Sequence, residues 1–588
     1  MTVLTSLTSV MAAQGIDALI IPRADEFLGE YIPAANERLH YVSEFTGSAG
    51  LCVVTQARAA VFVDGRYTVQ VKQQVDTRWF DINPLSDQAL GDWLQSNVSE
   101  SGVIGIDART ISREQMQRWQ ERWPQFQWQD TQGNLVDSVW VDRPPVVALS
   151  GRGLDERYAG ESSLSKRQRL GDTLKKKGLD GYWVFLPESV SWLLNVRGRD
   201  IPQLPILQSH ALLASNGDVL WFVESDRLPE NWQEICDSGI TVVAPSELSS
   251  TLAQWTRRTV GADPANTNAA SWSALVEAGI TVQASDCPLM SAKARKNSIE
   301  VDGARRAHLR DAVAKAQFLA WIDKTVSHGV LPTEAELADQ LHQFRAAHSD
   351  FIEPSFSTIS AAGPNAALCH YNHRTAAAPA RLTMNSLYLV DSGGQYLYGT
   401  TDVTRTVAIG KPSDEMRKHF TLVLKGHIAL ARIRFPRGTS GMQLDPLARQ
   451  YLWQHELDFE HGTGHGVGSY LSVHEGPQRI AKLGSPVPLE IGMIVSNEPG
   501  YYAENEYGIR CENLQVVVPA DSEGYLQFET LTLLPFDQRL IDVDLLTRTE
   551  TEWLNAYHQR VHSALQPLVP SDCQDWLTHA TRPLERSE

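Results

Sequence analysis

The segment LYLVDSGGQYLYGTTDVTRTVA, residues 387–408, decides the fold of the C-terminal half of the chain. A run of apolar residues leads to Asp391, and the two glycines that follow allow a sharp reversal. The residues after the reversal are rich in β-branched and aromatic side chains and carry Asp402. We therefore predict a β-hairpin in which the apolar run Leu387–Val390, ending at Asp391, pairs with a strand from Tyr396 to Ala408 that carries Asp402. Either aspartate alone would be interpreted as a turn or cap residue, but on adjacent strands the two carboxylates can face one another across a metal pair.

Three further metal-seeking side chains follow in order. They are His465 in HGTGHGVG (461–468), Glu498 in SNEPG (496–500) and Glu512 in RCEN (510–513). Four carboxylates at one point raise one another's pKa, so they ionise together at neutral pH only around cations. An oxygen-rich set with one nitrogen favours hard or borderline ions such as manganese over a thiolate-type zinc site. The set also suits two ions that share carboxylates and activate water, which predicts a two-metal hydrolase.

The glycine-rich segment 461–468 needs comparison with the zinc helix motif, because its two histidines are four residues apart. Its four glycines make a helix unfavourable, since each costs about 1 kcal/mol relative to alanine. We expect a loop and a strand whose backbone lies close to a ligand. His465 is then the metal ligand and His461 a substrate-facing neighbour, with His370 and His474 as further candidates beside the carboxylates.

Glu498 and Arg510 have expected roles beyond ligation. A carboxylate beside a metal-activated water can accept its proton and later deliver it to the leaving amine, which is the role we assign to Glu498. Arg510 lies two residues before Glu512, so on a strand both side chains point to the same face. We expect Arg510 either to orient Glu512 or to form an ordinary salt bridge.

Length and composition indicate the class of protein. At 588 residues we expect three or four domains. A net charge of −18 argues against a nucleic-acid binder, and no stretch approaches the roughly 20 apolar residues that span a bilayer. The six cysteines are scattered without a Cys-x-x-Cys pair, and no basic residue precedes Arg23. These features predict a reduced, cytoplasmic protein.

The N-terminal half contains an internal repeat. GIDALII (15–21) is echoed by GLDGYWV (178–184), and AVFVD (60–64) by LWFVE (220–224). Each copy has the pattern of a buried strand. We favour two copies of one α/β domain, at 1–145 and 146–297, while two unrelated α/β domains would give a similar pattern.

Beyond this half, the apolar residues change to helical spacing. They recur at three- and four-residue steps from Ser298 to about Ser327, and Thr333 is the expected N-cap of the next helix. We place a catalytic domain at 298–525. The tail, 526–588, contains an expected helix from Thr549 through His562. It is too short for a rich core of its own, so it should dock on the catalytic domain or on a partner subunit.

Together these motifs resemble the pita-bread metallopeptidases, which include methionine aminopeptidases, prolidases and aminopeptidase P. The order Asp, Asp, His, Glu, Glu is similar to that family's dinuclear site. The closest resemblance is to the long, cytosolic, three-domain Xaa-Pro aminopeptidases. It is carried by HGTGHGVG, VHEGP (473–477), NEPGYY (497–502), LGEY (28–31), FTGSAG (45–50), WLLNVRG (192–198) and WLNAYH (553–558). At DEF (25–27) the chain lacks the histidine expected in the first-domain motif.

The resemblance implies an α/β (α+β) fold with two creatinase-like N-terminal domains, a pita-bread catalytic domain and a short C-terminal extension. It implies two divalent ions, most commonly Mn²⁺, and a homodimer that acts on peptides with proline at position two. Asp391 would hold one ion, His465 and Glu498 the other, with Asp402 and Glu512 bridging. By the same resemblance, three histidines would contact the scissile carbonyl and the following proline: His370, His461 and His474.

Three alternatives on the same fold remain. A prolidase, restricted to dipeptides, uses the same five ligands, but the duplicated N-terminal half and the C-terminal extension argue against it. Creatine hydrolysis works without the metals, so the intact ligand set argues against that activity. A catalytically inactive module that binds peptides or proteins would be expected to have lost ligands, and all five are present.

Overall fold

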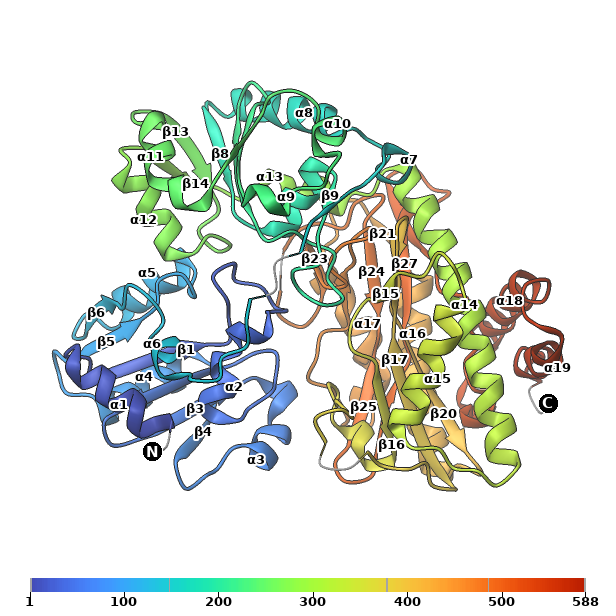
Figure 1. Cartoon of the computed structure of the whole chain (residues 1–588). Coiled ribbons are helices and arrows are strands. Elements are labelled where there is room, and N and C mark those ends of the chain that lie inside the picture. Colours follow the sequence, from blue (N-terminus) through green and yellow to red (C-terminus); the bar gives the residue numbers. More distant parts are fainter. Residues whose placement is uncertain (1–2, 147–148, 377–378, 485, 586–588) are drawn as a thin grey trace. The chain divides into compact units, whose positions relative to one another are not determined.

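The structure is a computed structural model that describes residues 3–146, 149–376, 379–484 and 486–585. The chain forms two compact units (Figure 1). The first comprises Met1–Asp155 with Glu161–Leu289, and the second Glu156–Gly160 with Met290–Glu588. Among the described residues, no helix has the length and apolar character needed to cross a membrane.

The first sheet of the N-terminal unit has the strand order β4-β3-β2-β1-β5-β6. Strands β1, β2 and β3 pair antiparallel, whereas β3–β4, β1–β5 and β5–β6 are parallel. The central strands are buried on both faces because helices cover the sheet, which explains their continuous apolar runs. The strand bounds are β1 Ala18–Pro22, β2 Leu51–Thr55, β3 Ala59–Val63, β4 Phe80–Pro84, β5 Val103–Ile106 and β6 Gln127–Asp130.

The second sheet repeats this topology strand for strand. Its order is β12-β11-β10-β8-β13-β14, and each pair runs in the same relative direction as its counterpart. The repeated segments 15–21 and 178–184 lead into the equivalent strands β1 and β8, and 60–64 and 220–224 overlap β3 and β11, so the duplication is confirmed. The bounds are β8 Gly181–Val184, β10 His210–Ala214, β11 Val219–Phe222, β12 Ile240–Val243, β13 Thr259–Ala262 and β14 Thr281–Ala284.

Asp25, in the DEF segment, shapes a turn in the first domain of this unit. Its Oδ1 accepts hydrogen bonds from the backbone N–H groups of Phe27 and Gly29, each at 3.0 Å. Its Oδ2 accepts a hydrogen bond from Nε2 of Gln208 at 2.9 Å. Leu28 between them has a φ of 57°, a conformation that these hydrogen bonds stabilise. The carboxylate at this position therefore ties the turn of the first domain to the second domain.

The C-terminal unit contains antiparallel sheets with helices packed on them. A three-stranded sheet has the order β16-β17-β20, and a six-stranded sheet has the order β21-β28-β27-β24-β22-β23. Two short sheets, β15-β18-β19 and β25-β26, complete the strands. The bounds are β15 Glu353–Pro354, β16 Ile359–Ala362, β17 Ser386–Ser392, β18 Gly394–Tyr396, β19 Gly399–Thr400, β20 Val403–Ile409, β21 Arg434–Pro436, β22 Gly464–Gly466, β23 Glu475–Ile480, β24 Ile494–Asn497, β25 Gly500–Ala503, β26 Tyr507–Arg510, β27 Asn513–Pro519 and β28 Tyr525–Thr530.

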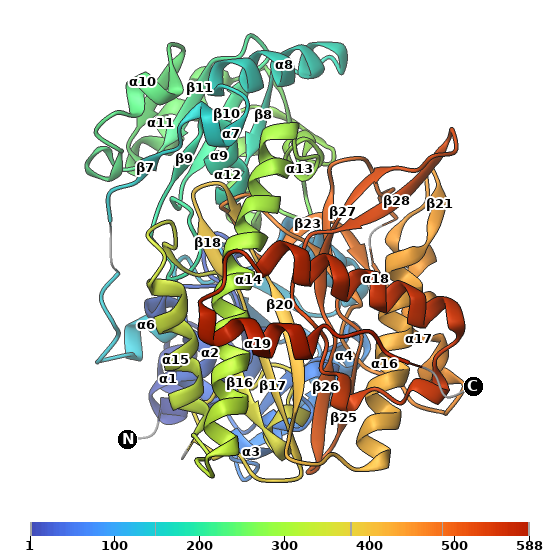
Figure 2. The same cartoon turned by 90° about the vertical axis from the view of Figure 1, so that its right-hand side faces the viewer.

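Six helices of this unit frame the sheets. The predicted helix at 298–327 is confirmed as α14, and the predicted N-cap Thr333 forms a capping box with Glu336 at the start of α15. The helix expected from Thr549 is α18, and α18 and α19 both contact α14 (Figure 2). The bounds are α14 Ser298–Ser327, α15 Glu334–Ala346, α16 Asp414–Arg432, α17 Gly441–Trp453, α18 Arg548–Leu565 and α19 Ser571–Ala580.

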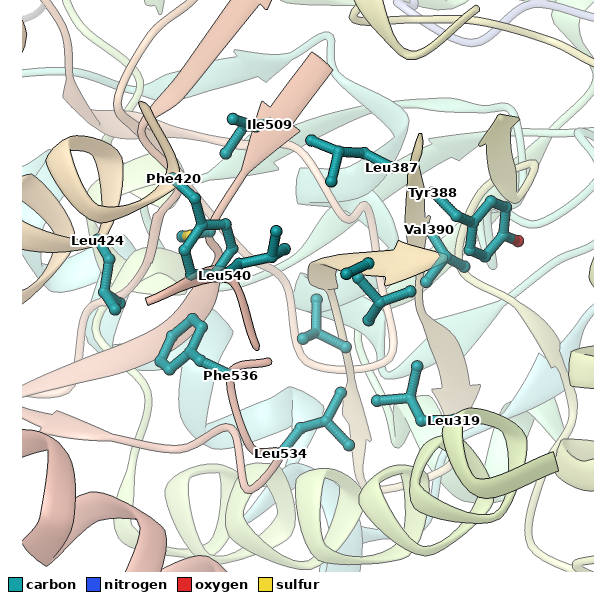
Figure 3. Close-up of a cluster of buried hydrophobic side chains, with 14 of the residues drawn as sticks. Leu319, Leu387, Tyr388, Val390, Phe420, Leu424, Ile509, Leu534, Phe536 and Leu540 are labelled. Carbon is teal, nitrogen blue, oxygen red and sulfur yellow. The ribbon is translucent and has the colours of Figure 1, made fainter. Parts of the chain in front are cut away.

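The C-terminal extension docks on the core of the catalytic domain. Leu534, Phe536 and Leu540 are buried against side chains of α14, α16, β17 and β26 (Figure 3). Each fully buried leucine or phenylalanine contributes about 1.5–3 kcal/mol relative to an exposed one. Of the two docking modes expected from the sequence, the structure shows the intramolecular one.

Candidate metal centre

Asp391 and Asp402 lie on the predicted hairpin. β17 and β20 pair antiparallel with Asp391 opposite Thr404, and Asp402 immediately precedes β20. Because side chains alternate along a strand, Asp402 and Thr404 lie on the face that carries Asp391. The hairpin thus brings both carboxylates to one side of the sheet.

The segment between these strands differs from the prediction, which made Tyr396–Ala408 a single strand. Residues 394–400 instead form the separate hairpin β18–β19, which belongs to another sheet. The N–H of Gly394 donates to Thr401 Oγ1, and the N–H of Thr401 donates to Gly394 O, both at 2.9 Å. A Cβ on Gly393 would collide with Thr401 O, so glycine permits this close approach.

His465 lies on strand β22, as predicted, and not on a helix. Its Nδ1–H donates to Gly466 O at 2.8 Å, so Nε2 is the ring nitrogen that faces two carboxylates. Nε2 lies 3.5 Å from Asp402 Oδ2 and 3.4 Å from Glu498 Oε1. A hydrogen bond from the second ring nitrogen to a carbonyl is the usual way in which proteins orient a metal-binding histidine.

Glu498 and Glu512 complete the set. Ser496 Oγ donates to Glu498 Oε1 at 2.9 Å and accepts the N–H of His465 at 2.9 Å. Thr404 Oγ1 donates to Glu512 Oε2 at 2.7 Å. One ligand atom from each of Asp402, His465 and Glu512 lies within 4.8 Å of the others, close enough to share an ion.

The charges at this point are not balanced by the protein alone. Burial and the neighbouring carboxylates raise the pKa of Glu512 well above its usual value, and they also raise the pKa of Asp402. Burial lowers the pKa of His465, but Asp402 and Glu498 outweigh it and raise that pKa to about 9. The cluster therefore stabilises added positive charge.

Two oxygens give an independent test of whether cations fit. Among the described residues, Asp391 Oδ1 and Asp402 Oδ1 are buried and accept no hydrogen bond. Buried carboxylate oxygens are normally satisfied, so this unpartnered pair marks a place for ions. Four carboxylates and one histidine are suited to two divalent cations.

Arg510 contacts Asp391 and not Glu512, contrary to one of the two expectations. Its Nη2 donates to Asp391 Oδ2 at 2.7 Å and its Nε to Thr404 Oγ1 at 3.0 Å. β26 ends at Arg510 and β27 begins at Asn513, so the alternation assumed for a continuous strand does not apply. Arg510 reaches Glu512 only through the Thr404 hydroxyl. Burial raises the pKa of Asp391, but Arg510 more than offsets this and lowers it.

The predicted histidines lie beside this cluster. Arg510 Nη1 donates to Tyr502 Oη at 2.7 Å, and Tyr502 Oη lies 2.7 Å from His461 Nε2. His461 Nδ1 lies 2.8 Å from Gly462 O, and burial together with Arg510 lowers the pKa of His461 well below its usual value. Tyr502 therefore donates to a neutral His461.

His474 and His370 also reach the site. The ring of His474 packs edge-on against that of His465, with centroids 4.4 Å apart. The charge of His370 acts on His461, so His370 lies near it. The structure thus brings the histidine candidates to the carboxylates, while their roles toward a substrate remain predictions.

Sequence reasoning missed two sets of contacts, one beside His474 and one at His461, that hold the backbone of these histidines. Lys296 Nζ and Lys293 Nζ each lie 2.5 Å from the buried carboxylate of Glu475, next to His474. Arg449 Nη2 donates to His461 O at 2.9 Å, and its Nε donates to Asp445 at 2.7 Å. The lysines are about 180 residues from Glu475, so no local pattern signals the contact.

Thr404 and Tyr502 were also missed, although local signals exist for both. Thr404 lies two residues after Asp402 in a β-rich segment, so alternation alone places it on the ligand face. Tyr502 is part of NEPGYY, four residues after Glu498.

Comparisons with known proteins show the family. Residues 302–519 match the metallopeptidase family M24, 4–139 and 142–300 the creatinase/prolidase N-terminal domain, and 524–584 the C-terminal region of peptidase M24. Aminopeptidase P1 of Lotus japonicus is 37% identical over 99% of both chains. The chain belongs to the aminopeptidase P family of M24 metallopeptidases. The resemblance to Xaa-Pro aminopeptidases and the predicted order of two creatinase-like domains and a pita-bread domain are confirmed.

Solved structures agree with this membership of M24. X-prolyl aminopeptidase of Caenorhabditis elegans, described as a cytosolic enzyme with a di-nuclear active site, is 35% identical, covers 99% of both chains and has a TM-score of 0.94. Dipeptidase PepE of Mycobacterium ulcerans is 22% identical, with a TM-score of 0.52 over 65% of this chain and 98% of its own. The second comparison shows a shared fold alone. The aminopeptidase, in contrast, matches the whole domain order.

Proposed function

We propose that this chain is a metal-dependent aminopeptidase that hydrolyses the N-terminal Xaa-Pro bond of peptides. One observation supports it above the others: His465 Nε2 lies 3.5 Å from Asp402 Oδ2 and 3.4 Å from Glu498 Oε1, beside buried carboxylate oxygens that accept no hydrogen bond. That arrangement is suited to cations. Full-length relatives named Xaa-Pro aminopeptidase P and X-prolyl aminopeptidase supply the substrate class, peptides with proline at position two.

The assignment of ligands follows the family resemblance. Asp391 would hold one cation, His465 and Glu498 would hold the other, and Asp402 and Glu512 would be shared. When bound, two divalent cations supply Lewis acidity and lower the pKa of water. Oxygen donors with a single imidazole favour manganese, which we propose as the physiological ion.

Glu498 is the proposed proton carrier. Ser496 holds its Oε1 at 2.9 Å, and burial raises the pKa of the carboxyl, which makes it a better proton acceptor. Glu498 accepts the proton of the attacking water and donates it to the proline nitrogen as the bond to that nitrogen breaks. The first residue of the peptide leaves as an amino acid, and the remainder leaves with a new N-terminal proline.

The histidines supply the proposed substrate contacts. His370, His461 and His474 are assigned to the scissile carbonyl and the proline ring. Neutral His461 is oriented by hydrogen bonds at both ring nitrogens, so its ring cannot turn without losing them. A fixed ring beside the metal cluster is suited to shaping a pocket for a rigid proline.

The prolidase alternative requires a cation for the carboxylate directly after proline, typically an arginine. Of the arginines near the motifs, Arg405 and Arg510 donate to groups inside the protein, and neither is available for a dipeptide carboxylate. Arg374 is exposed. The commitments of Arg405 and Arg510 favour a site that stays open beyond proline. We also propose a homodimer in the cytoplasm, in line with the family resemblance.

A peptide series tests the proposed activity. Release of the first residue is measured from Xaa-Pro, Xaa-Pro-Xaa and Xaa-Ala-Xaa peptides with the same first residue. We expect the tripeptide with proline to be cleaved at least as well as the dipeptide, and the alanine peptide to lose most of the rate. A strong preference for the dipeptide would assign the chain to the prolidases, and indifference to proline would exclude both activities.

A further inference from the structure

Arg405 occupies the face of β20 opposite the metal ligands. Its neighbour Thr404 points toward Glu512, so Arg405 points away from it, and its side chain is buried, with the guanidinium 4.1 Å from the centre of the Phe536 ring. A buried guanidinium is costly unless its donors are satisfied. Arg405 thus requires a complete set of acceptors in the surrounding backbone.

The acceptors of Arg405 are all oxygens of uncharged groups. Nη1 donates to Glu512 O at 2.6 Å and to Thr404 O at 2.8 Å, which holds the backbone of one proposed metal ligand. The remaining donors reach Asn513 Oδ1 at 2.8 Å, Leu534 O at 2.6 Å, Pro535 O at 3.0 Å and Tyr557 Oη at 3.2 Å. One side chain therefore joins two strands of the catalytic domain to the C-terminal extension.

The hydrogen bonds continue from Asn513 to Asn497, the residue directly before the other proposed glutamate ligand, Glu498. Asn513 Nδ2 lies 3.2 Å from Nε2 of the buried His427 on α16, and His427 Nδ1 lies 3.0 Å from Asn497 O. Asn497 Nδ2 donates back to His427 O at 3.0 Å. Burial and Arg405 lower the pKa of His427 to about 3, so the ring is neutral, with Nδ1–H as donor and Nε2 as acceptor.

This chain of contacts, which we call the Arg405 relay, is built from five side chains: Tyr557, Arg405, Asn513, His427 and Asn497. Asn513 directly follows Glu512, Asn497 directly precedes Glu498, and the two asparagines are paired across β24 and β27. Fixing this pair fixes the backbone from which both glutamates project.

The C-terminal extension supplies one end of the relay. Tyr557 Oη donates to Leu534 O at 2.8 Å and receives the Leu534 N–H at 3.3 Å, so helix α18 holds the segment that binds Arg405. The Tyr557 ring is stacked on Trp553 with centroids 5.5 Å apart. Leu534 and Phe536 are anchored in the catalytic core (Figure 3).

We propose that the Arg405 relay positions Glu498 and Glu512 for metal binding, which makes the C-terminal extension a working part of the metal centre. Arg405, His427 and Tyr557 are positioning residues in this account, which rests on the proposed metal site. Partners that orient ligands typically contribute about 10–100-fold to metal affinity. Because the relay acts on the backbone of the ligands, we expect its effect on metal affinity to lie at the lower end of that range.

The test measures Mn²⁺ affinity of the metal-free, full-length protein by calorimetry, well below the melting temperature of each variant. Arg405→Lys removes the forked donors, and Tyr557→Phe removes one hydroxyl while keeping the stacked ring. The matched control is Trp576→Phe, which breaks the 2.8 Å hydrogen bond from Trp576 Nε1 to Asp323 Oδ2 between α19 and α14, outside the relay.

We expect about 10-fold weaker Mn²⁺ binding for Arg405→Lys and a smaller loss in the same direction for Tyr557→Phe. In both, kcat should fall while KM changes less than about twofold, because the substrate pocket is untouched. Trp576→Phe should lower the melting temperature without changing the affinity. If both relay variants bind Mn²⁺ with wild-type affinity and only their melting temperatures fall, the proposed role of the relay in metal binding is overturned.

Three outcomes need separate assignment. If Arg405→Lys does not fold, Tyr557→Phe decides the question alone. If the wild-type protein itself binds no Mn²⁺, Zn²⁺ or Co²⁺, the proposed metal centre fails, and the relay fails with it for that reason. Weaker binding in Trp576→Phe to the same extent as in Tyr557→Phe would assign the effect to general loosening of the extension and would also overturn the relay.

Discussion

His465 Nε2 lies 3.4 Å from Glu498 Oε1, and Nε2 is the ring nitrogen that faces the carboxylates because Nδ1 donates to Gly466 O. Asp402 and Glu498 raise the pKa of His465 to about 9, so the cluster stabilises a positive charge at this nitrogen, which a bound cation would supply in place of the proton. Asp402 Oδ2, 3.5 Å from the same nitrogen, adds a further negative charge. The site therefore has the electrostatics of a cation centre before any ligand is considered.

Glu498→Gln keeps the shape of the side chain and removes its ability to carry a proton. We expect kcat to fall by about 10²–10⁴-fold from loss of the general base, and further if metal binding also weakens. Steady-state kinetics with an Xaa-Pro-Xaa peptide, together with metal content, separates the two contributions. An unchanged kcat with a raised KM would remove Glu498 from proton transfer.

Alanine variants of the histidines should differ in their metal content. His465→Ala removes a proposed ligand, so the purified protein should lose metal. His370→Ala and His474→Ala should lower kcat with near-normal metal content, because these rings are assigned to substrate. Metal analysis by mass spectrometry after dialysis decides the matter, and equal metal loss in all three variants would contradict the assignment.

His558 predicts a pH dependence of stability that is independent of the metal site. It is fully buried on α18, its Nε2 accepts the N–H of Phe536 at 3.2 Å, and burial together with Arg405 lowers its pKa to about 3. An unfolded histidine has a pKa of about 6.5. Between these values only the unfolded state binds the proton, so stability present above pH 6.5 is lost as the pH falls toward 3.

The size of this effect is about 1.4 kcal/mol per pH unit for one group within that window. Urea unfolding of wild type and His558→Gln between pH 7 and pH 4.5 measures it. The variant should be less stable at pH 7 but should lose less stability on acidification. Parallel pH profiles for the two proteins would show that His558 has the same pKa in the folded and unfolded states, which would contradict the lowered pKa.

Local patterns predicted much of the fold and the ligand set. The apolar run before Asp391, the Gly393-Gly394 turn and the β-branched and aromatic residues after it predicted the hairpin that carries Asp391 and Asp402, and the glycines of 461–468 correctly excluded a helix around His465. Thr333 was recognised as a cap because capping chemistry lies within four residues. Each of these features depends on neighbours in the sequence.

Contacts between distant segments could not be predicted in this way. Arg510 was expected to lie on one strand with Glu512, but the chain changes sheets between them, and its partner Asp391 is 119 residues away. The acceptors of Arg405 on Pro535 and Tyr557 are 130 and 152 residues away. Periodicity and turn chemistry carry no information on which distant carbonyl meets a buried arginine.

Metal removal and return tests the central claim most directly. The protein is stripped with a chelator, its metal content is verified, and Mn²⁺ is then titrated while binding stoichiometry and cleavage of an Xaa-Pro-Xaa peptide are both measured. The proposed site predicts no activity in the stripped protein, two ions bound per chain, and recovery of activity that is largest with Mn²⁺. Full activity in a verified metal-free preparation would contradict a two-metal mechanism.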